Sequence, residues 1–99
     1  MNIEINEVYT FKVSSGEEVI GKVVNLNEKY IELSEPLSVA PGPQGMGLMQ
    51  TVFTSEPGAV VRLNINAVTM YTTTEENIKM KYIETTTGFK VPSKKIVLG

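Results

Sequence analysis

The acidic side chains are the first place to look for chemistry, and all 11 of them are glutamates. The chain of 99 residues contains no His, no Asp and no Cys. A Ser-His-Asp or Cys-His arrangement therefore cannot be assembled within one protomer, and the usual nitrogen and sulfur ligands of zinc are missing. No disulfide can form. This composition favours a binding or structural protein, with no cofactor and no metal, over an enzyme.

Two acidic doublets, Glu17–Glu18 and Glu75–Glu76, are the remaining candidates for acid–base catalysis. Two carboxyl groups placed across a cleft can hydrolyse a glycoside. Neighbouring residues of a strand point to opposite faces, so Glu17 and Glu18 make a poor pair. Glu75 and Glu76 suit the first turn of a helix, where negative charge is favourable. We therefore expect no catalytic residues.

The elements that would position binding groups are strands, because apolar and polar residues alternate along most of the chain. Five main strands are predicted at residues 8–13, 17–26, 30–40, 48–54 and 67–72, with a short extended piece near 60–63. Gly16 can adopt positive φ in the first turn. Residues 41–47, PGPQGMG, are expected to form an irregular loop. The predicted fold is mainly β, a small, strongly bent antiparallel barrel.

Gly21 lies inside the second predicted strand, where a glycine weakens strand pairing. A five-stranded sheet closes into a barrel only if its strands curve sharply, and curvature is concentrated at glycines and bulges. Gly21 is therefore expected to mark the bend, and Gly16 and Gly21 are the structural glycines.

The C-terminal part of the chain predicts a short helix over residues 74–88, with a sixth strand as the alternative. Thr73 or Thr74 would cap it and Gly88 would end it. Its apolar stripe would comprise Ile78, Tyr82 and Ile83, although the β-branched run TTT argues against a long helix. Residues 89–99 would form a tail that is mobile or bound to a partner. The prediction is one domain over residues 1–99, with the barrel at residues 8–72.

The formal net charge is −2, but the charges are unevenly spread. Residues 1–40 hold seven Glu and three Lys, a net of −4, and residues 79–99 hold five Lys and one Glu, a net of +4. The basic end could be a contact surface, or simply a solvated terminus. The sequence has neither an 18-residue apolar run nor a leader-like N-terminus. Together with the absence of Cys, this predicts a cytoplasmic protein with no membrane partner.

The segment from Ser14 to Leu33 resembles the first motif of the Sm/LSm family, which includes bacterial Hfq. Two glycines five residues apart and three apolar residues match the motif in place: Gly16, Val19, Gly21, Val23 and Leu26. Two further apolar residues, Ile31 and Leu33, match if the intervening loop is one residue shorter. The stretch NINAVTMYT, residues 64–72, resembles the second motif. The whole chain is similar to small uncharacterised Sm-like proteins from phages of marine bacteria, which implies the cytoplasm of a bacterial or phage-infected host cell. A helix after the barrel departs from the usual pattern.

The resemblance implies a closed homo-oligomeric ring of about five to seven protomers, in which the fourth strand of one protomer pairs with the fifth of the next. It also implies that two segments line the pore and bind single-stranded RNA or DNA. The candidate residues in them are Asn25, Asn27, Lys29, Tyr30, Arg62, Asn64 and Asn66. The family's RNA-contacting Asp corresponds to Asn27, and its Asn partner to Lys29 or Tyr30. The second motif's Arg-Gly pair is absent, unless Arg62 supplies the Arg with displaced spacing.

Each of these residue types has a binding role and a structural alternative. Tyr30 could stack on a base or occupy a half-buried strand position. The asparagines could bond to base edges or sugar hydroxyls, or simply form turns. Lys29 and Arg62 could hold phosphates, or Arg62 could form an ion pair at the rim or between protomers.

Two functions are therefore expected from the sequence. The first is a ring that binds single-stranded nucleic acid, RNA foremost, as a non-catalytic scaffold or chaperone in RNA or DNA processing. The alternative is a protein–protein assembly module that keeps the ring without nucleic-acid binding. Met46, Leu48 and Met49 fit packing within or between protomers, or a peptide-binding surface.

Overall fold

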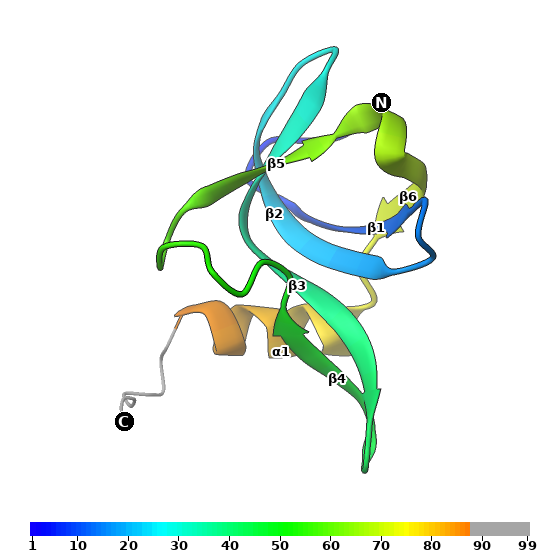
Figure 1. Ribbon diagram of the computed structural model, residues 1–99, viewed down its shortest axis with the longest axis vertical. Coiled ribbons are helices and arrows are strands. Elements are labelled where there is room, and N and C mark those ends of the chain that lie inside the picture. Colours follow the sequence, from blue (N-terminus) through cyan, green and yellow to red (C-terminus); the bar gives the residue numbers. More distant parts are fainter. Residues whose placement is uncertain (88–99) are drawn as a thin grey trace.

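The computed structural model describes residues 1–87 of the chain. It is mainly β, with one C-terminal α-helix lying across one side of a strongly bent antiparallel sheet (Figure 1). In chain order the elements are β1 (Val8–Val13), β2 (Glu18–Leu26), β3 (Tyr30–Gly42), β4 (Gly45–Gln50), β5 (Val60–Asn64), the 3₁₀ turn η1 (Ile65–Ala67), β6 (Val68–Thr73) and α1 (Glu76–Thr87). The predicted mainly β, antiparallel fold with a short C-terminal helix is confirmed.

The long strand β3 organises the sheet, whose strand order is β4-β3-β2-β1-β6. One edge of β3 pairs with β2, while the other edge pairs first with β5 and then with β4. The last strand, β6, returns to pair with β1. The extended piece expected near residues 60–63 is therefore a full strand, β5, and the sheet has six strands rather than five main ones.

The sheet bends where β2 and β3 lose register, between Ile20 and Lys22 and again between Val23 and Asn25. Gly21 lies at the first shift, and a Cβ added there would meet the Leu33 side chain at 3.2 Å. On the opposite strand Glu35 has a φ of 50°, a conformation that non-glycine residues seldom adopt. The glycine thus permits a close approach between the strands, at the bend where the sequence predicted it.

Two apolar clusters form on opposite faces of the bent sheet. The first lies inside the curve and contains Tyr9, Phe11, Val19, Val23, Ile31 and Leu33. The second lies beneath α1 and contains Val8, Ile20, Leu37 and Tyr82. Neighbouring residues such as Val8 and Tyr9 belong to different clusters because a strand directs successive side chains to opposite faces. The helix therefore covers apolar residues that would otherwise lie on the outside of the sheet.

Tyr82 fixes α1 to the sheet. It is only 3% exposed, and its hydroxyl accepts a hydrogen bond from the Lys22 N–H at 3.1 Å and donates one to the Ser34 carbonyl at 2.8 Å. The β2–β3 pair loses register beside Lys22 and Ser34. The Tyr82 hydroxyl therefore provides a hydrogen-bond partner for the Lys22 N–H and for the Ser34 carbonyl at the bend. Of the predicted stripe, only Tyr82 is buried; Ile78 and Ile83 remain partly exposed.

The ends of the helix differ from the sequence prediction. The Glu75 carboxylate accepts a hydrogen bond from the Ile78 N–H, so Glu75 provides the cap expected of Thr73 or Thr74. The run of threonines is helical to Thr87, and Thr85, Thr86 and Thr87 each donate a hydroxyl hydrogen bond to the carbonyl four residues earlier. The expected stop at Gly88 and the tail at 89–99 lie outside the described residues.

The irregular loop predicted over residues 41–47 is wrong. β3 continues to Gly42 and β4 begins at Gly45, so the two strands form a tight hairpin that projects from the sheet (Figure 1). Gly45 has a φ of +105°, which places the chain reversal at a residue without a side chain. The predicted strand at 48–54 is therefore shifted: it ends at Gln50, and residues 51–59 form a turning segment that leads into β5.

Candidate nucleic-acid interface

The two segments that carry the candidate residues meet at one end of the sheet. Tyr30, the first residue of β3, lies opposite Asn64, the last residue of β5. The Ile65 N–H donates a hydrogen bond to the Lys29 carbonyl at 3.0 Å, which joins the β2–β3 turn to the start of η1. Six of the seven candidate side chains are exposed, and Tyr30 is half-buried. Residues more than 30 positions apart in sequence therefore share one surface, which we call the loop cluster.

The asparagines of the loop cluster form turns through their side-chain oxygens. Asn27 Oδ1 accepts hydrogen bonds from the Lys29 and Tyr30 N–H groups, at 2.8 and 3.0 Å. Asn64 Oδ1 accepts one from the Asn66 N–H at 2.8 Å, and Asn25 Oδ1 one from the Leu26 N–H at 2.9 Å. Because each oxygen is engaged, the orientation of each carboxamide is fixed.

The same bonds leave the other half of each carboxamide available. Within residues 1–87, the Nδ2 amino groups of Asn25, Asn27 and Asn64 have no hydrogen-bond partner, and all three residues are exposed. Each amino group supplies two donors. The loop cluster is therefore rich in neutral donors, and its chemical complement is a ligand rich in acceptors, such as base carbonyls, ring nitrogens or phosphate oxygens.

Tyr30 and Arg62 contact each other within the loop cluster. The Arg62 guanidinium carbon lies 4.8 Å from the centre of the Tyr30 ring, which is a cation–π geometry. Arg62 Nε also donates a hydrogen bond of 3.0 Å to Glu32 Oε2, and Glu32 is the residue directly opposite Arg62 in the β3–β5 pair. That hydrogen bond is the main cause that raises the pKa of Arg62, with the Tyr30 side chain as a smaller one. Of the two roles considered for Arg62, the ion pair is therefore present within one protomer.

Glu32 belongs to the loop cluster through its contact with Arg62, and it was not among the residues that the sequence indicated. It is separated from Arg62 by 30 positions, and only the register of β3 against β5 brings the two together. The ion pair changes the charge of the loop cluster, because Glu28 and Glu32 balance Lys29 and Arg62. Attraction for an anionic strand must then come from Lys29, the amide donors and stacking more than from net charge.

The acidic doublets considered for catalysis have structural partners instead. The Ser38 hydroxyl donates a hydrogen bond to Glu17 Oε2 and is also 3.0 Å from the Thr51 hydroxyl. Glu18 lies 4.0 Å from Lys12 Nζ, and Glu75 caps α1. Glu17 therefore contacts β3, Glu18 contacts β1 and Glu75 caps α1, so these carboxylates have different neighbours.

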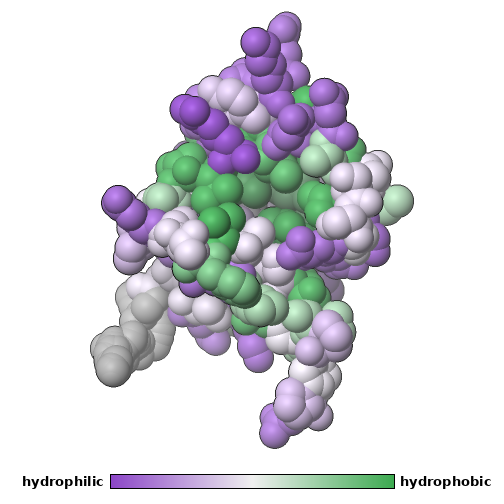
Figure 2. Space-filling model, viewed as in Figure 1, coloured by the Kyte–Doolittle hydropathy of each residue, from purple (hydrophilic) through white to green (hydrophobic). Residues whose placement is uncertain are grey.

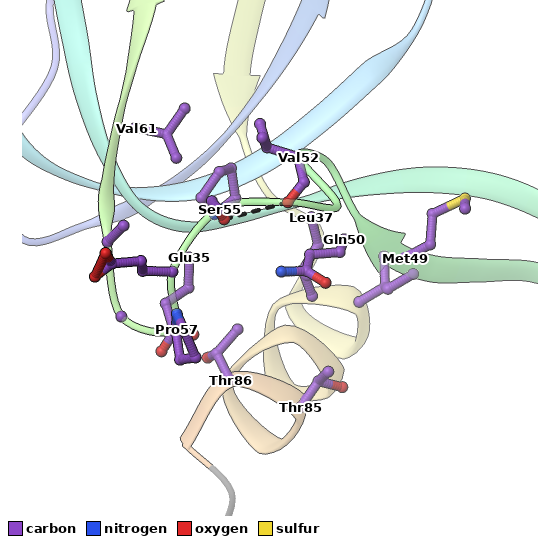
Figure 3. Close-up of a pocket in the computed structure, with 15 residues that line it drawn as sticks. Glu35, Leu37, Met49, Gln50, Val52, Ser55, Pro57, Val61, Thr85 and Thr86 are labelled. Atoms are coloured by element: carbon purple, nitrogen blue, oxygen red, sulfur yellow. Dashed lines mark hydrogen bonds between the residues drawn. The ribbon is translucent and has the colours of Figure 1, made fainter.

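Apolar residues gather in the middle of the face seen in Figure 1, around β5, with hydrophilic residues above them (Figure 2). Val60 in β5 and Val52 in the segment 51–59 are exposed apolar residues. Beside this region lies a hollow of about 280 Å³ between β3, β4, the segment 51–59 and the end of α1, where Val52, Val61 and Leu37 meet Gln50 and Thr86 (Figure 3). We call it the β5 hollow.

The edges of the sheet lie beside these apolar groups. Among residues 1–87, β5 pairs only with β3 and β6 pairs only with β1, so one edge of each strand has no strand partner. The outer edge of β4 is also unpaired among these residues.

No helix within the described residues has the length and apolar character needed to span a membrane. No protein-family model matches the chain, and no curated protein matches it.

Proposed function

We propose that the protein is an Sm-like, ring-forming protein that binds single-stranded nucleic acid, RNA foremost, as a non-catalytic scaffold or chaperone. The observation that carries the proposal is the convergence of two distant segments at Tyr30 and Asn64, with amide donors and an aromatic ring on one surface. Base stacking on an aromatic side chain contributes about 1–3 kcal/mol per base. The amide donors would meet the acceptor atoms of bases and phosphates.

The Sm-like part of the proposal is supported by the order of the strands. A bent β2–β3 pair is followed by β4 and β5, which both pair with β3, and then by the short turn η1 and by β6, which pairs with β1. The motif that resembles the family's second one, residues 64–72, covers the end of β5, all of η1 and most of β6.

The ring is supported by free strand edges. The fourth and fifth main strands of the sequence prediction correspond to β4 and β6, and β5 also pairs with β3 beyond β4, so the edge of β4 or of β5 is available to pair with that of β6. Unpaired N–H and C=O groups on a strand edge invite pairing with another chain. An edge-to-edge contact between different strands, repeated around a closed rotation, satisfies both edges at once. Repetition would also multiply a weak site, because every protomer presents the same loop cluster to one strand.

The experiment is light scattering on the full chain, with and without a fluorescent oligo-uridine RNA. The proposal expects a discrete closed oligomer that binds the RNA, and Tyr30→Ala is expected to weaken binding about tenfold by removing a stacking platform. Lys29→Ala should also weaken binding. Lys22→Ala is the matched control, because Lys22 is an exposed lysine on β2 outside the loop cluster. A discrete oligomer that ignores both RNA and DNA would contradict the nucleic-acid part.

A second candidate function is a protein–protein assembly module that keeps the ring. The observation that favours it is the Arg62–Glu32 ion pair, which removes one of the cations expected to hold phosphate. In that case the oligomer forms, nucleic acid does not bind, and Glu32→Gln does not create binding.

A further inference from the structure

Phe53 is the most exposed large apolar side chain of the described residues, at 69%. It lies in the segment 51–59 that joins β4 to β5. The neighbouring Val52 lines the β5 hollow of its own protomer, whereas Phe53 does not line it (Figure 3). Turn hydrogen bonds hold the segment compact, from the Ser55 N–H to the Val52 carbonyl and from the Ala59 N–H to the Glu56 carbonyl. Phe53 is thus a large aromatic group presented outward beside a free strand edge.

A groove of about 440 Å³ lies on the outer face of the sheet, beside the start of α1. Its apolar walls are Ile20, Val39, Met46, Leu48 and Ile78, and its border toward β6 is formed by Thr72, Thr73 and Thr74. We call it the outer groove. Met46 and Ile78 border the outer groove and are exposed. The flexible Met46 side chain can adapt to an inserted ring. Its volume is within the range that accepts an organic group.

Strand pairing would bring these two features together. β5 has five residues and β6 has six. Antiparallel pairing centred on Arg62 of one protomer and Met70 of the next sets Val60 opposite Thr72. The segment that precedes Val60 then enters beside Thr73 and Thr74 of the neighbour, which border the outer groove. Phe53 precedes Val60 by seven residues, and a chain spans at most about 3.3 Å per residue, so Phe53 lies within about 23 Å of the paired edge.

We propose that Phe53 of one protomer docks into the outer groove of the next copy of this chain, and that this contact fixes the direction of assembly. The proposal rests on the ring in the proposed function but not on nucleic-acid binding. Burying an aromatic side chain supplies much of the energy of an interface, and the strand edges alone supply little discrimination between partners. The interface is heterologous, because the projecting residue and the groove lie on different edges of the protomer.

Dilution measurements on the full chain test the contribution of Phe53. Phe53→Ser is expected to weaken self-association about tenfold or more while the circular dichroism spectrum of the protomer stays unchanged. Met46→Glu, at an exposed residue of the outer groove, should act in the same direction. The double variant should lose less than the sum of the two, because both substitutions remove the same contact. Met80→Ser is the control, since Met80 is 54% exposed but borders neither the groove nor an edge.

Cross-linking tests the docking directly, because the natural chain has no cysteine. Thr54→Cys protein mixed with Thr74→Cys protein should be joined by a short bismaleimide, whereas Thr54→Cys mixed with Met80→Cys should not; Thr54 is the exposed neighbour of Phe53, so this variant keeps the aromatic ring. Val60→Cys mixed with Thr72→Cys reports on the strand edges alone. If the edge pair cross-links but the Thr54 pair does not, and Phe53→Ser associates normally, the docking proposal is overturned and the ring stands. A wild-type protein that is monomeric at every concentration overturns both.

Discussion

At the scale of single residues, the hydroxyl of Tyr82 has the largest consequence for stability. It serves a backbone donor and a backbone acceptor at a bend where the strands have lost register. Tyr82→Phe keeps the ring and removes both bonds, leaving two partly buried backbone groups without these partners. We expect the free energy of unfolding to fall by about 1–3 kcal/mol, measured by urea denaturation. Tyr71→Phe, which removes a single bond to the exposed Asn2 N–H, is the control and should change little.

The same residue predicts how stability depends on pH. Burial, the largest cause, raises the pKa of Tyr82 from 10.0 to about 12; the bond from Lys22 lowers it and the Glu35 charge raises it further. A raised pKa in the folded state means that folding favours the neutral phenol. Its contribution is fully present below pH 10 and is lost as the pH rises from 10 to 12. Denaturation at pH 9 and pH 11.5 should show this loss, and Tyr82→Phe should reduce it.

Glu32 offers a residue-scale test of the loop cluster. Glu32→Gln removes the carboxylate that engages Arg62, so the pKa of Arg62 returns toward its ordinary value and the guanidinium becomes available to a ligand. RNA affinity, measured by fluorescence anisotropy, should rise about threefold or more. Glu28→Gln is the control, because it removes the same charge from a residue that forms no ion pair with Arg62 among residues 1–87. Comparing the two variants therefore distinguishes the release of Arg62 from the effect of one negative charge fewer. Equal gains from the two variants would contradict a specific role for Glu32.

At the scale of elements, the bend at Gly21 is the feature that a substitution would disturb most. A Cβ there would lie 3.2 Å from the side chain of Leu33, which would have to shift although it is fully buried in the inner cluster. Gly21→Ala should therefore destabilise the protein by about 1–3 kcal/mol. Gly47→Ala is the control within β4, because the nearest atom to an added Cβ there is 3.9 Å away. Thermal unfolding of both variants measures the difference.

The elements also show how far the sequence can predict this fold. The predicted residues of β1 and β2 agree closely with the structure, because both strands are rich in apolar and β-branched residues and a turn at Gly16 separates them. β4 was misplaced because GMGLMQ, with two glycines and two exposed methionines, lacks such a strand signal. Its register is set by pairing with β3 rather than by its own pattern. The helix was predicted, but its cap at Glu75 was not, since glutamate is an uncommon capping residue.

The candidate site was predictable in its location and not in its electrostatics. The Asn residues marked two turns, and turn residues are visible in the sequence. The two turns meet because β3 pairs with β5. The sequence indicated β5 only as a short extended piece and did not indicate this pairing. The Arg62–Glu32 pair and the Tyr82 bonds each require a register that a single sequence does not provide.

At the scale of the whole molecule, the balance of charges in the loop cluster predicts how nucleic-acid binding responds to salt. Only Lys29 among the cations of the cluster lacks an ion pair within residues 1–87. Binding should therefore show a shallow dependence, with log affinity falling against log salt by roughly 0.7 per protomer engaged. Glu32→Gln should steepen that slope by about the same amount, since it frees a second cation. A steep slope in the wild-type protein would indicate that binding uses a different surface.

The closure of β6 onto β1 also has a consequence for how the chain is made. Tyr9 in β1 pairs with Thr73 in β6, so the first strand must wait for most of the chain to leave the ribosome before its outer edge is covered. The β1–β2–β3 meander can pair early, because its contacts are local. During synthesis the nascent protein therefore presents an open strand at its N-terminal end, where a chaperone or another nascent copy could pair with it before β6 arrives.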